Sequence, residues 1–184
     1  TGEKSIMNWR GSVLYGEPTY IIAHNPAFPI REPKWEIVFH FDIGKFGRVL
    51  KGTHRVRPIE YLINPSAIQA TKYIADLARD VRPISFDIET IGGETACVGV
   101  SNNTDSGMCI NFRNAREHHY TEYEERYVRR ELARLFSSKK HFIAQNGQFD
   151  CNWLAYKDGI YATCTFDTLL AHHTLYPGLP HNLG

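Results

Sequence analysis

Two short segments of the sequence place acidic residues where they could bind metal ions. The first is Phe86–Thr90 (FDIET), and the second, further along the chain, is Asn146–Asp150 (NGQFD). The first segment has the apolar alternation of a buried strand. Because side chains two residues apart on a strand point to the same side, we expect Asp87 and Glu89 to share one face.

Two carboxylates on one face of a strand require a partner. They repel each other and raise each other's pKa unless a cation neutralises them, and charge is costly to bury in an otherwise apolar strand. Oxygen ligands of this kind suit Mg²⁺ or Mn²⁺. With Asp150 from the second segment, Asp87 and Glu89 would supply most of a carboxylate site for two divalent metal ions. A two-metal phosphodiester hydrolase requires such an arrangement.

Each acidic position also has a simpler structural explanation. An Asp-x-Glu triplet is common and is usually a pair of solvated charges. Asp150 lies at a predicted strand-to-helix junction beside Phe149 and Trp153, where an aspartate often caps the following helix. Capping and metal binding therefore both remain open for Asp150.

The composition is typical of a globular protein that is not embedded in a membrane. The chain has 184 residues, of which 42% are hydrophobic and 12% aromatic, and its formal net charge is +1. No apolar run approaches the roughly 20 residues of a membrane span, and no signal peptide is recognisable. We expect a cytoplasmic protein, in bacteria or in phage-infected cells, without a membrane partner. Neither half of the chain is basic enough to bind nucleic acid by charge alone.

The cysteines do not suggest a structural metal site. Four are present, with no CxxC spacing among them. This pattern argues against structural zinc and predicts free thiols in a reducing compartment.

Turn residues and apolar periodicity divide the chain into three blocks, 1–50, 51–80 and 81–184. The elements predicted in the first two blocks are strands at 20–23 and 59–63 and helices at 34–46 and 67–79. Beyond the strand that carries Asp87 and Glu89, the third block has predicted strands at 96–101, 108–112 and 141–144 and predicted helices at 122–137, 149–156 and 166–175. Three adjacent strands followed by helix, strand and helix predict an α/β fold, with a mixed sheet flanked by helices. That plan fits the ribonuclease-H-like fold.

The acidic segments resemble motifs of a known enzyme family. Phe86–Thr90 is similar to the first motif of the DEDD 3'-5' exonucleases, and Asn146–Asp150 resembles the second. Phe166–His173 (FDTLLAHH) is similar to the segment that follows in the proofreading domains of family A DNA polymerases, those of the bacterial polymerase I type. The three motifs occur in the family's order.

The resemblance implies a role for each matching residue. Asp87, Glu89 and Asp150 would be the catalytic ligands of two divalent metal ions, Mg²⁺ or Mn²⁺, which activate water and stabilise the transition state and the departing 3' oxygen.

The nucleic-acid-binding residues of this block would be Thr90, Asn146 and Phe149. They would hold the 3' end of single-stranded DNA, with the Phe149 ring available to stack on a base. Asp167 lies where the family has an acid that is usually not a ligand, and we expect it to cap its own helix.

One departure from the family pattern concerns the fourth carboxylate. It belongs to a third motif, Tyr-x-x-x-Asp or His-x-x-x-x-Asp, and no acidic residue follows Asp167. The spacing of His172, His173 and His181 does not complete either form. The chain either stops short of this motif or is a degenerate domain. We favour truncation, and we expect weak metal binding and little or no activity from this polypeptide.

Residues 1–50 show a fainter resemblance to the C-terminal part of a uracil-DNA-glycosylase-like domain. It is carried by 8–12 (NWRGS), the predicted strand that leads into 24–27 (HNPA), and 31–35 (REPKW). The family's His-Pro-Ala motif is interrupted here by an asparagine. The resemblance implies that His24 faces DNA, whereas a lone histidine in a turn is more often a hydrogen-bonded structural residue.

Together these features predict an internal fragment of a phage-like family A DNA polymerase. It would contain the end of a glycosylase-like α/β domain (1–50), a connecting strand and helix (51–80) and an incomplete ribonuclease-H-like exonuclease domain (81–184). The intact protein would remove 3'-terminal nucleotides from single-stranded DNA during DNA replication, with a polymerase domain downstream in the same full-length chain. The alternatives are a stand-alone RNA-trimming exonuclease of the ribonuclease D kind and a non-catalytic nucleic-acid-binding module of the same fold.

Overall fold

A computed structural model describes residues 9–114 and 117–181 and divides the chain into two compact units. Unit 1 comprises Thr1–Val56 and Tyr176–Pro180, and unit 2 comprises Arg57–Leu175 and His181–Gly184. The segment that follows the last helix therefore contributes to both units.

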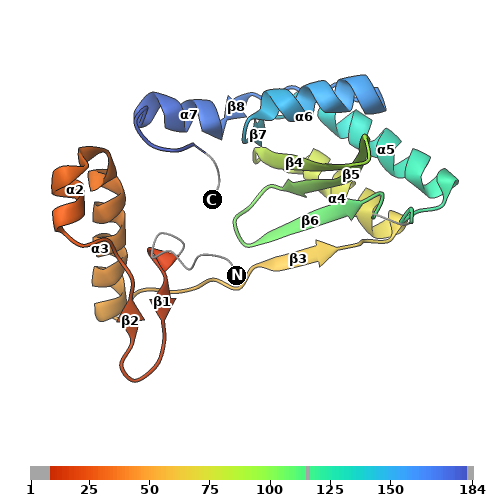
Figure 1. The fold of residues 1–184 in the computed structure, drawn as a ribbon. Helices are drawn as coiled ribbons and strands as arrows, with labels where there is room; N and C mark the ends of the chain where they lie inside the picture. Colours follow the sequence, from red (N-terminus) through yellow and green to blue (C-terminus); the bar gives the residue numbers. More distant parts are fainter. Residues whose placement is uncertain (1–8, 115–116, 182–184) are drawn as a thin grey trace. The chain divides into compact units, whose positions relative to one another are not determined.

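Unit 2 is built on a six-stranded mixed sheet with the strand order β3-β6-β5-β4-β7-β8 (Figure 1). The strands are β3 (Glu60–Ile63), β4 (Ile84–Ile91), β5 (Glu94–Ser101), β6 (Ser106–Asn111), β7 (Phe142–Ala144) and β8 (Phe166–Asp167). Strand β5 runs antiparallel to both β4 and β6, and the other neighbouring pairs are parallel. The predicted α/β class with a mixed sheet flanked by helices is confirmed.

The helices of unit 2 begin at well-defined sequence signals. They are α4 (Ala67–Arg79), α5 (Glu122–Phe136), α6 (Gly147–Trp153), the π-helical turn η2 (Leu154–Asp158) and α7 (Thr168–Leu175). Ser66 with Gln69, and Thr121 with Glu124, form capping boxes that satisfy the first backbone N–H groups of α4 and α5. The predicted helix at 67–79 has the bounds of α4.

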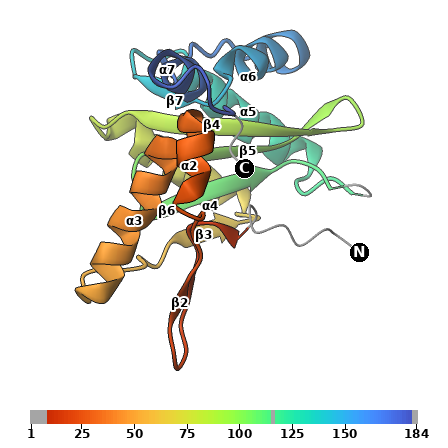
Figure 2. The same ribbon diagram turned by 60° about the vertical axis from the view of Figure 1, so that its left-hand side comes forward.

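The hydrophobic core lies on one face of the sheet, against α4 and α5. Both helices lie on the same side of the sheet in two views, and β4 and β5 run side by side along their length (Figures 1 and 2). Strand β4 sends Ile84, Phe86 and Ile88 into this core. The Phe86 ring meets Phe136 of α5 edge to face, with 5.0 Å between ring centroids. Residues of β4 between these positions therefore face away from the core.

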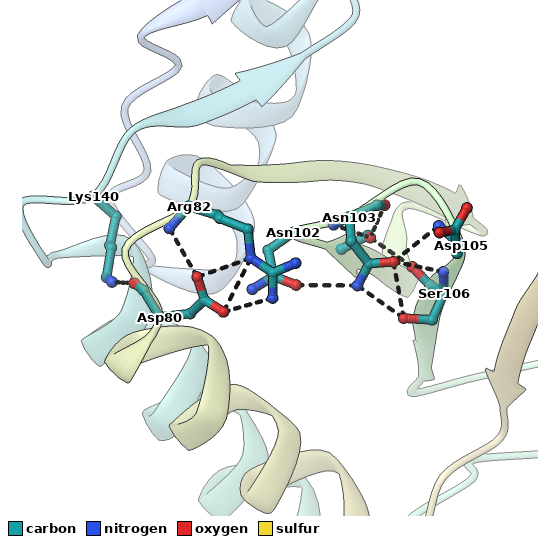
Figure 3. Close-up of polar contacts among 8 residues, drawn as sticks. Asp80, Arg82, Asn102, Asn103, Asp105, Ser106 and Lys140 are labelled. Atoms are coloured by element: carbon teal, nitrogen blue, oxygen red, sulfur yellow. Dashed lines mark hydrogen bonds and ion pairs between the residues drawn. The ribbon is translucent and has the colours of Figure 1, made fainter.

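A polar network fixes the start of β4 (Figure 3). The Asp80 carboxylate, just after α4, accepts hydrogen bonds from the Arg82 backbone N–H and guanidinium. This guanidinium holds the pKa of Asp80 well below its usual range. The Lys140 ammonium donates to the Asp80 carbonyl. In the neighbouring β5–β6 turn, the Asn103 side chain accepts from the backbone N–H of Ser106 at 2.7 Å. The network joins the end of α4, the start of β4 and the segment before β7.

Unit 1 contains little secondary structure besides one long helix. Its elements are β1 (Val13–Leu14), β2 (Tyr20–Ile21), α2 (Ala27–Arg31), the 3₁₀ turn η1 (Pro33–Trp35) and α3 (Glu36–Leu50). The ion pair between Arg10 and the buried Asp42, at 2.8 Å, joins the start of the unit to α3. The predicted helix at 34–46 continues through Gly47, because one glycine inside a helix costs only about 1 kcal/mol.

Two elements near the second acidic segment differ from the predicted ones. The helix predicted at 149–156 begins earlier, at Gly147, and changes into η2 at Leu154. A helix is predicted at 166–175, but its first two residues form the strand β8, and helix α7 begins only after them. The first residue of β8 pairs with Ile143 of β7. A two-residue strand has no periodicity, so its sequence cannot distinguish it from a helix start. The strand and helix of the block 51–80, β3 and α4, lie within unit 2.

The predictions about thiols and membrane spans can be compared directly with the structure. All four cysteines are free and half-buried, as predicted. Over residues 9–114 and 117–181, no helix has the length and apolar character needed to cross a membrane.

Gly147→Ala is expected to destabilise unit 2 by about 1–3 kcal/mol through overpacking. A Cβ at this position would lie 2.8 Å from the Ala144 Cβ and 2.8 Å from the Cys164 Sγ. Urea denaturation followed by circular dichroism measures the free energy of unfolding. Gly47→Ala is the control, because the added Cβ would meet nothing within 4 Å beyond the adjacent backbone of its own helix, and alanine favours a helix interior. An unchanged midpoint for Gly147→Ala would contradict the close packing at the start of α6.

Candidate active site

Asp87 and Glu89 lie on the same face of β4, as predicted, and this face is opposite to the core. Their partners on β5 are Gly99 and Cys97. Burial raises the pKa of the Asp87 carboxyl, and the nearby charge of Glu89 raises it further. The pair therefore has the unneutralised repulsion that the sequence predicts.

Asp150 is brought to the backbone of β4. It lies in the first turn of α6, is only 3% exposed, and its Oδ1 accepts a hydrogen bond of 3.0 Å from the Ile88 N–H. Strand β7 pairs with β4 only at Ile84 and Ser85, so the Ile88 N–H lies beyond that pairing and is satisfied by the carboxylate instead. The Asp150 carboxylate thus reaches the residue that separates Asp87 from Glu89.

The electrostatic environment of Asp150 couples it to Asp87. Burial is the main cause that raises the pKa of Asp150, and the charges of Asp87 and Asp167 add to it, whereas the hydrogen bond from Ile88 lowers it. No lysine or arginine of the described chain is among the groups that shift the pKa of Asp87 or Asp150. A bound cation would relieve the repulsion within this cluster.

Asp167 caps two helices. Its Oδ1 accepts from the Leu169 N–H of α7 at 2.9 Å, which confirms that it caps its own helix. The same carboxylate accepts from Asn146 N–H at 3.1 Å and from Gly147 N–H at 2.9 Å, at the start of α6. The sequence did not indicate this second role, because the two segments are distant in the chain. Asp167 therefore fixes the helix that carries Asp150.

The predicted nucleic-acid contacts Asn146, Phe149 and Thr90 lie on the same local segments as the carboxylates. Asn146 is exposed and has a left-handed backbone conformation, with φ of 56°. Phe149 leaves 50% of its surface exposed. Thr90 is half-buried at the end of β4, where the register with β5 shifts. Their contacts with nucleic acid stay predictions.

His24 belongs to unit 1 and is buried, with 8% of its surface exposed. Its ring stacks on Phe28 with 4.6 Å between centroids and meets Trp35 edge to face at 5.7 Å. Its Nε2 has no hydrogen-bond partner within the described residues. The structure therefore gives His24 an aromatic environment, and its contact with DNA stays a prediction.

The carboxylates fit divalent metal ions by their chemistry. Asp87, Glu89 and Asp150 offer only oxygen donors, the kind that Mg²⁺ and Mn²⁺ prefer. Across the parts of the chain that the structure describes, no three or more His, Cys, Asp or Glu side chains are arranged to enclose a metal ion. The site is thus an open group of coupled carboxylates.

Comparison with known families identifies the fold that carries this site. Residues 63–184 match the family described as 3'-5' exonuclease. The match includes the last residue of β3, all of the strands from β4 to β8, both acidic segments and Asp167. The chain belongs to the 3'-5' exonuclease family.

Comparison with solved structures gives distant similarities. The exonuclease domain of Aedes aegypti Nibbler is 16% identical, with a TM-score of 0.48, over 68% of this chain and 62% of that one. Brucella melitensis NrnC is 19% identical, with a TM-score of 0.47, over 68% and 56%. The EXD2 exonuclease domain is 12% identical, with a TM-score of 0.46, over 67% and 64%. The chain thus spans roughly three fifths of each of these proteins, and no curated protein sequence matches it.

Two of these similar proteins have been studied with divalent metal ions. Brucella melitensis NrnC has been solved with bound Mg²⁺ and bound to pGG. The EXD2 domain has been solved after soaking in Mg or in Mn together with GMP.

Asp167→Ala is expected to lower the free energy of unfolding by about 1–4 kcal/mol, because it removes two caps that are each worth roughly 0.5–2 kcal/mol. Asp167→Asn keeps one side-chain oxygen and should lose less. Urea denaturation gives the stability, and hydrogen exchange at the Gly147 amide reports on α6 directly. Equal exchange rates in the wild type and Asp167→Ala would contradict the role of Asp167 in holding α6.

Without metal, the contribution of Asp87 and Asp150 to stability is expected to fall as the pH rises through the interval above about 4, the ordinary pKa of aspartate. In that interval the carboxyls of Asp87 and Asp150, whose pKa values are raised by folding, hold more protons in the folded chain than in the unfolded chain. Melting temperatures measured from pH 4 to 7 in EDTA test this expectation.

Two variants separate the acid cluster from ordinary carboxylates in the same experiment. Asp87→Asn should flatten the decline, because it removes one of the coupled charges. Asp76→Asn, at a half-exposed position on α4 beside Lys72, should leave the decline in place. Identical profiles for the wild type and Asp87→Asn would show that the cluster is not coupled.

Proposed function

We propose that this chain carries the metal-dependent 3'-5' exonuclease of a family A DNA polymerase, which removes 3'-terminal nucleotides from single-stranded DNA during replication. The observation that carries the proposal is the hydrogen bond from Ile88 N–H to Asp150, which brings a third carboxylate to the two on β4. Membership of the 3'-5' exonuclease family supports it.

In this proposal Asp87, Glu89 and Asp150 hold the two divalent metal ions. When bound, the ions would lower the pKa of the attacking water and neutralise the charge that develops on the phosphate. The chain's own part is placement: Ile88 orients the Asp150 carboxylate, and Asp167 holds the start of α6. Asn146, Thr90 and the exposed ring of Phe149 would hold the terminal nucleotides.

The polymerase context rests on the motif resemblance. The order of the three motifs supports a proofreading domain with a polymerase domain in the same full-length protein. Residues 1–50 would then be the end of a glycosylase-like domain, as in phage-like polymerases, and His24 would mark its DNA-facing loop.

A non-catalytic nucleic-acid-binding module is the second candidate. One observation favours it: over residues 9–114 and 117–181 the acidic side chains do not enclose a metal ion. The described residues contain three of the four carboxylates in the family pattern. Both candidates have the same fold, but only the exonuclease requires bound metal ions. A measurement of metal binding therefore distinguishes them.

The 184-residue chain is expected to bind Mn²⁺ weakly, and Asp87→Ala should reduce its affinity at least about 100-fold, since even groups that only support a metal ligand contribute 10–100-fold. Electron paramagnetic resonance of free Mn²⁺ measures the binding. Asp150→Asn is the sharper variant, because its amide oxygen still accepts from Ile88 while a charged ligand is lost. Asp105→Asn, with an exposed side chain, is the control.

Cleavage is measured under single-turnover conditions, with protein in excess over 5'-labelled single strands of DNA or RNA and with Mg²⁺ or Mn²⁺. Slow shortening from the 3' end, lost in Asp87→Ala, is expected, and faster shortening of DNA than of RNA would support the polymerase context. If neither Asp87→Ala nor Asp150→Asn changes Mn²⁺ binding, the exonuclease proposal is wrong. Strand binding without metal binding would establish the module.

A further inference from the structure

Helix α6 and the turn η2 present aromatic side chains and a lysine along one side. Phe149, Trp153, Tyr156 and Lys157 are spaced at i, i+4, i+7 and i+8, and residues at such spacings share a helix face. We refer to these four residues as the aromatic stripe. Phe149 is 50% exposed and Tyr156 85% exposed. The stripe begins beside Asp150 and leads away from it.

The members of the stripe contact one another. The Phe149 and Trp153 ring centroids are 5.9 Å apart, with 30° between the planes. The Lys157 ammonium lies 5.6 Å from the centre of the Trp153 ring and 5.5 Å from that of Tyr156. A cation thus lies next to two aromatic faces, and such a combination suits the phosphates and bases of a single strand.

A buried network holds the stripe in place. The Trp153 indole N–H donates to the Thr95 Oγ1 at 3.0 Å, and Thr95 is 1% exposed. The Thr95 hydroxyl in turn donates to Asp158 at 2.6 Å, and Arg129 of α5 donates to the other oxygen of Asp158 at 2.7 Å. The edge of the indole is therefore anchored to β5, and side-chain entropy is already lost before a ligand binds.

The backbone of η2 sets the position of Tyr156 and Lys157. The π-helical turn departs from the regular α-helix in the segment that carries both residues, and such turns occur frequently at functional sites. The Asp158 side chain that closes the buried network belongs to the same turn. The conformation of η2 and the buried network therefore both fix the position of the Tyr156–Lys157 end of the stripe.

We infer that the aromatic stripe binds the part of a single-stranded nucleic acid that lies 5' of the terminal nucleotide. Bases stack on Phe149, Trp153 and Tyr156, and Lys157 neutralises a phosphate. The inference rests on the proposed function, because Phe149 beside Asp150 marks where the 3' end lies. The chemistry of stacking and of phosphate binding is shared by DNA and RNA.

The test measures binding of the complete 184-residue chain to fluorescent oligothymidylate of ten nucleotides, by anisotropy in EDTA. Tyr156→Ser is expected to weaken binding at least about fivefold, since stacking on one aromatic ring contributes about 1–3 kcal/mol per base. Lys157→Gln should reduce the slope of log affinity against log salt by about 0.7, as expected for one phosphate contact on a single strand. Oligouridylate of the same length tests whether RNA binds in the same way.

The controls match the variants in type and exposure. Tyr123→Ser alters a tyrosine that is 81% exposed on α5, and Lys139→Gln alters an exposed lysine outside the stripe. Both should bind like the wild type. The inhibition constant of thymidine dinucleotide, which is too short to span the stripe, should be the same for the wild type and Tyr156→Ser.

The outcomes separate the stripe from the exonuclease. If Tyr156→Ser and Lys157→Gln bind the ten-nucleotide strand as tightly as the wild type, the stripe does not bind nucleic acid, whatever the cleavage assay gives. If they weaken binding while Mn²⁺ binding does not depend on Asp87, the stripe stands and the exonuclease proposal fails. No binding of any single strand by the wild type in EDTA would overturn the stripe, whereas the exonuclease proposal would still be decided by Mn²⁺ binding and cleavage.

Discussion

The hydrogen bond from the Ile88 N–H to Asp150 is the contact on which the candidate site depends. It exists because β7 is short and leaves the β7-facing edge of β4 without a strand partner beyond Ser85, although β5 continues to pair with the other edge. A buried N–H without an acceptor costs about 1–3 kcal/mol, so the fold itself needs an acceptor at this point. An acidic side chain in the first turn of α6 meets that need, and the grouping of Asp150 with the two acidic residues of β4 follows from it.

The same contact brings acidic side chains together, and their repulsion destabilises the folded chain. Asp87, Glu89 and Asp150 share one region, and burial and mutual repulsion raise the pKa values of the two aspartates. The well-packed core on the other face of the sheet supports this arrangement, with β4 held between α5 and β5. Asp167 adds the caps that keep α6 against the sheet. The face of the sheet that packs against the helices thus stabilises the fold, and the opposite face carries the acidic residues of the candidate site.

Local signals made much of this predictable, and tertiary contacts account for the rest. The alternation in β4 predicted the shared face of Asp87 and Glu89, and the Asn-Pro-Ser start predicted the bounds of α4. The double capping by Asp167 could not be predicted, because it joins segments that the chain separates widely. The burial of His24 among aromatic rings also depends on folding, since its turn alone gives no indication of it.

The short length of β7 has a consequence for how such a domain can change over evolutionary time. The Ile88 N–H of β4 requires only a hydrogen-bond acceptor from α6, whereas a metal ion also requires a negatively charged ligand. Asparagine satisfies the first requirement without the second. A lineage that lost the metals but kept the fold would therefore be expected to carry asparagine at this position more readily than an aliphatic residue. The residue at position 150 would then distinguish a domain that has lost catalytic activity from one that retains it.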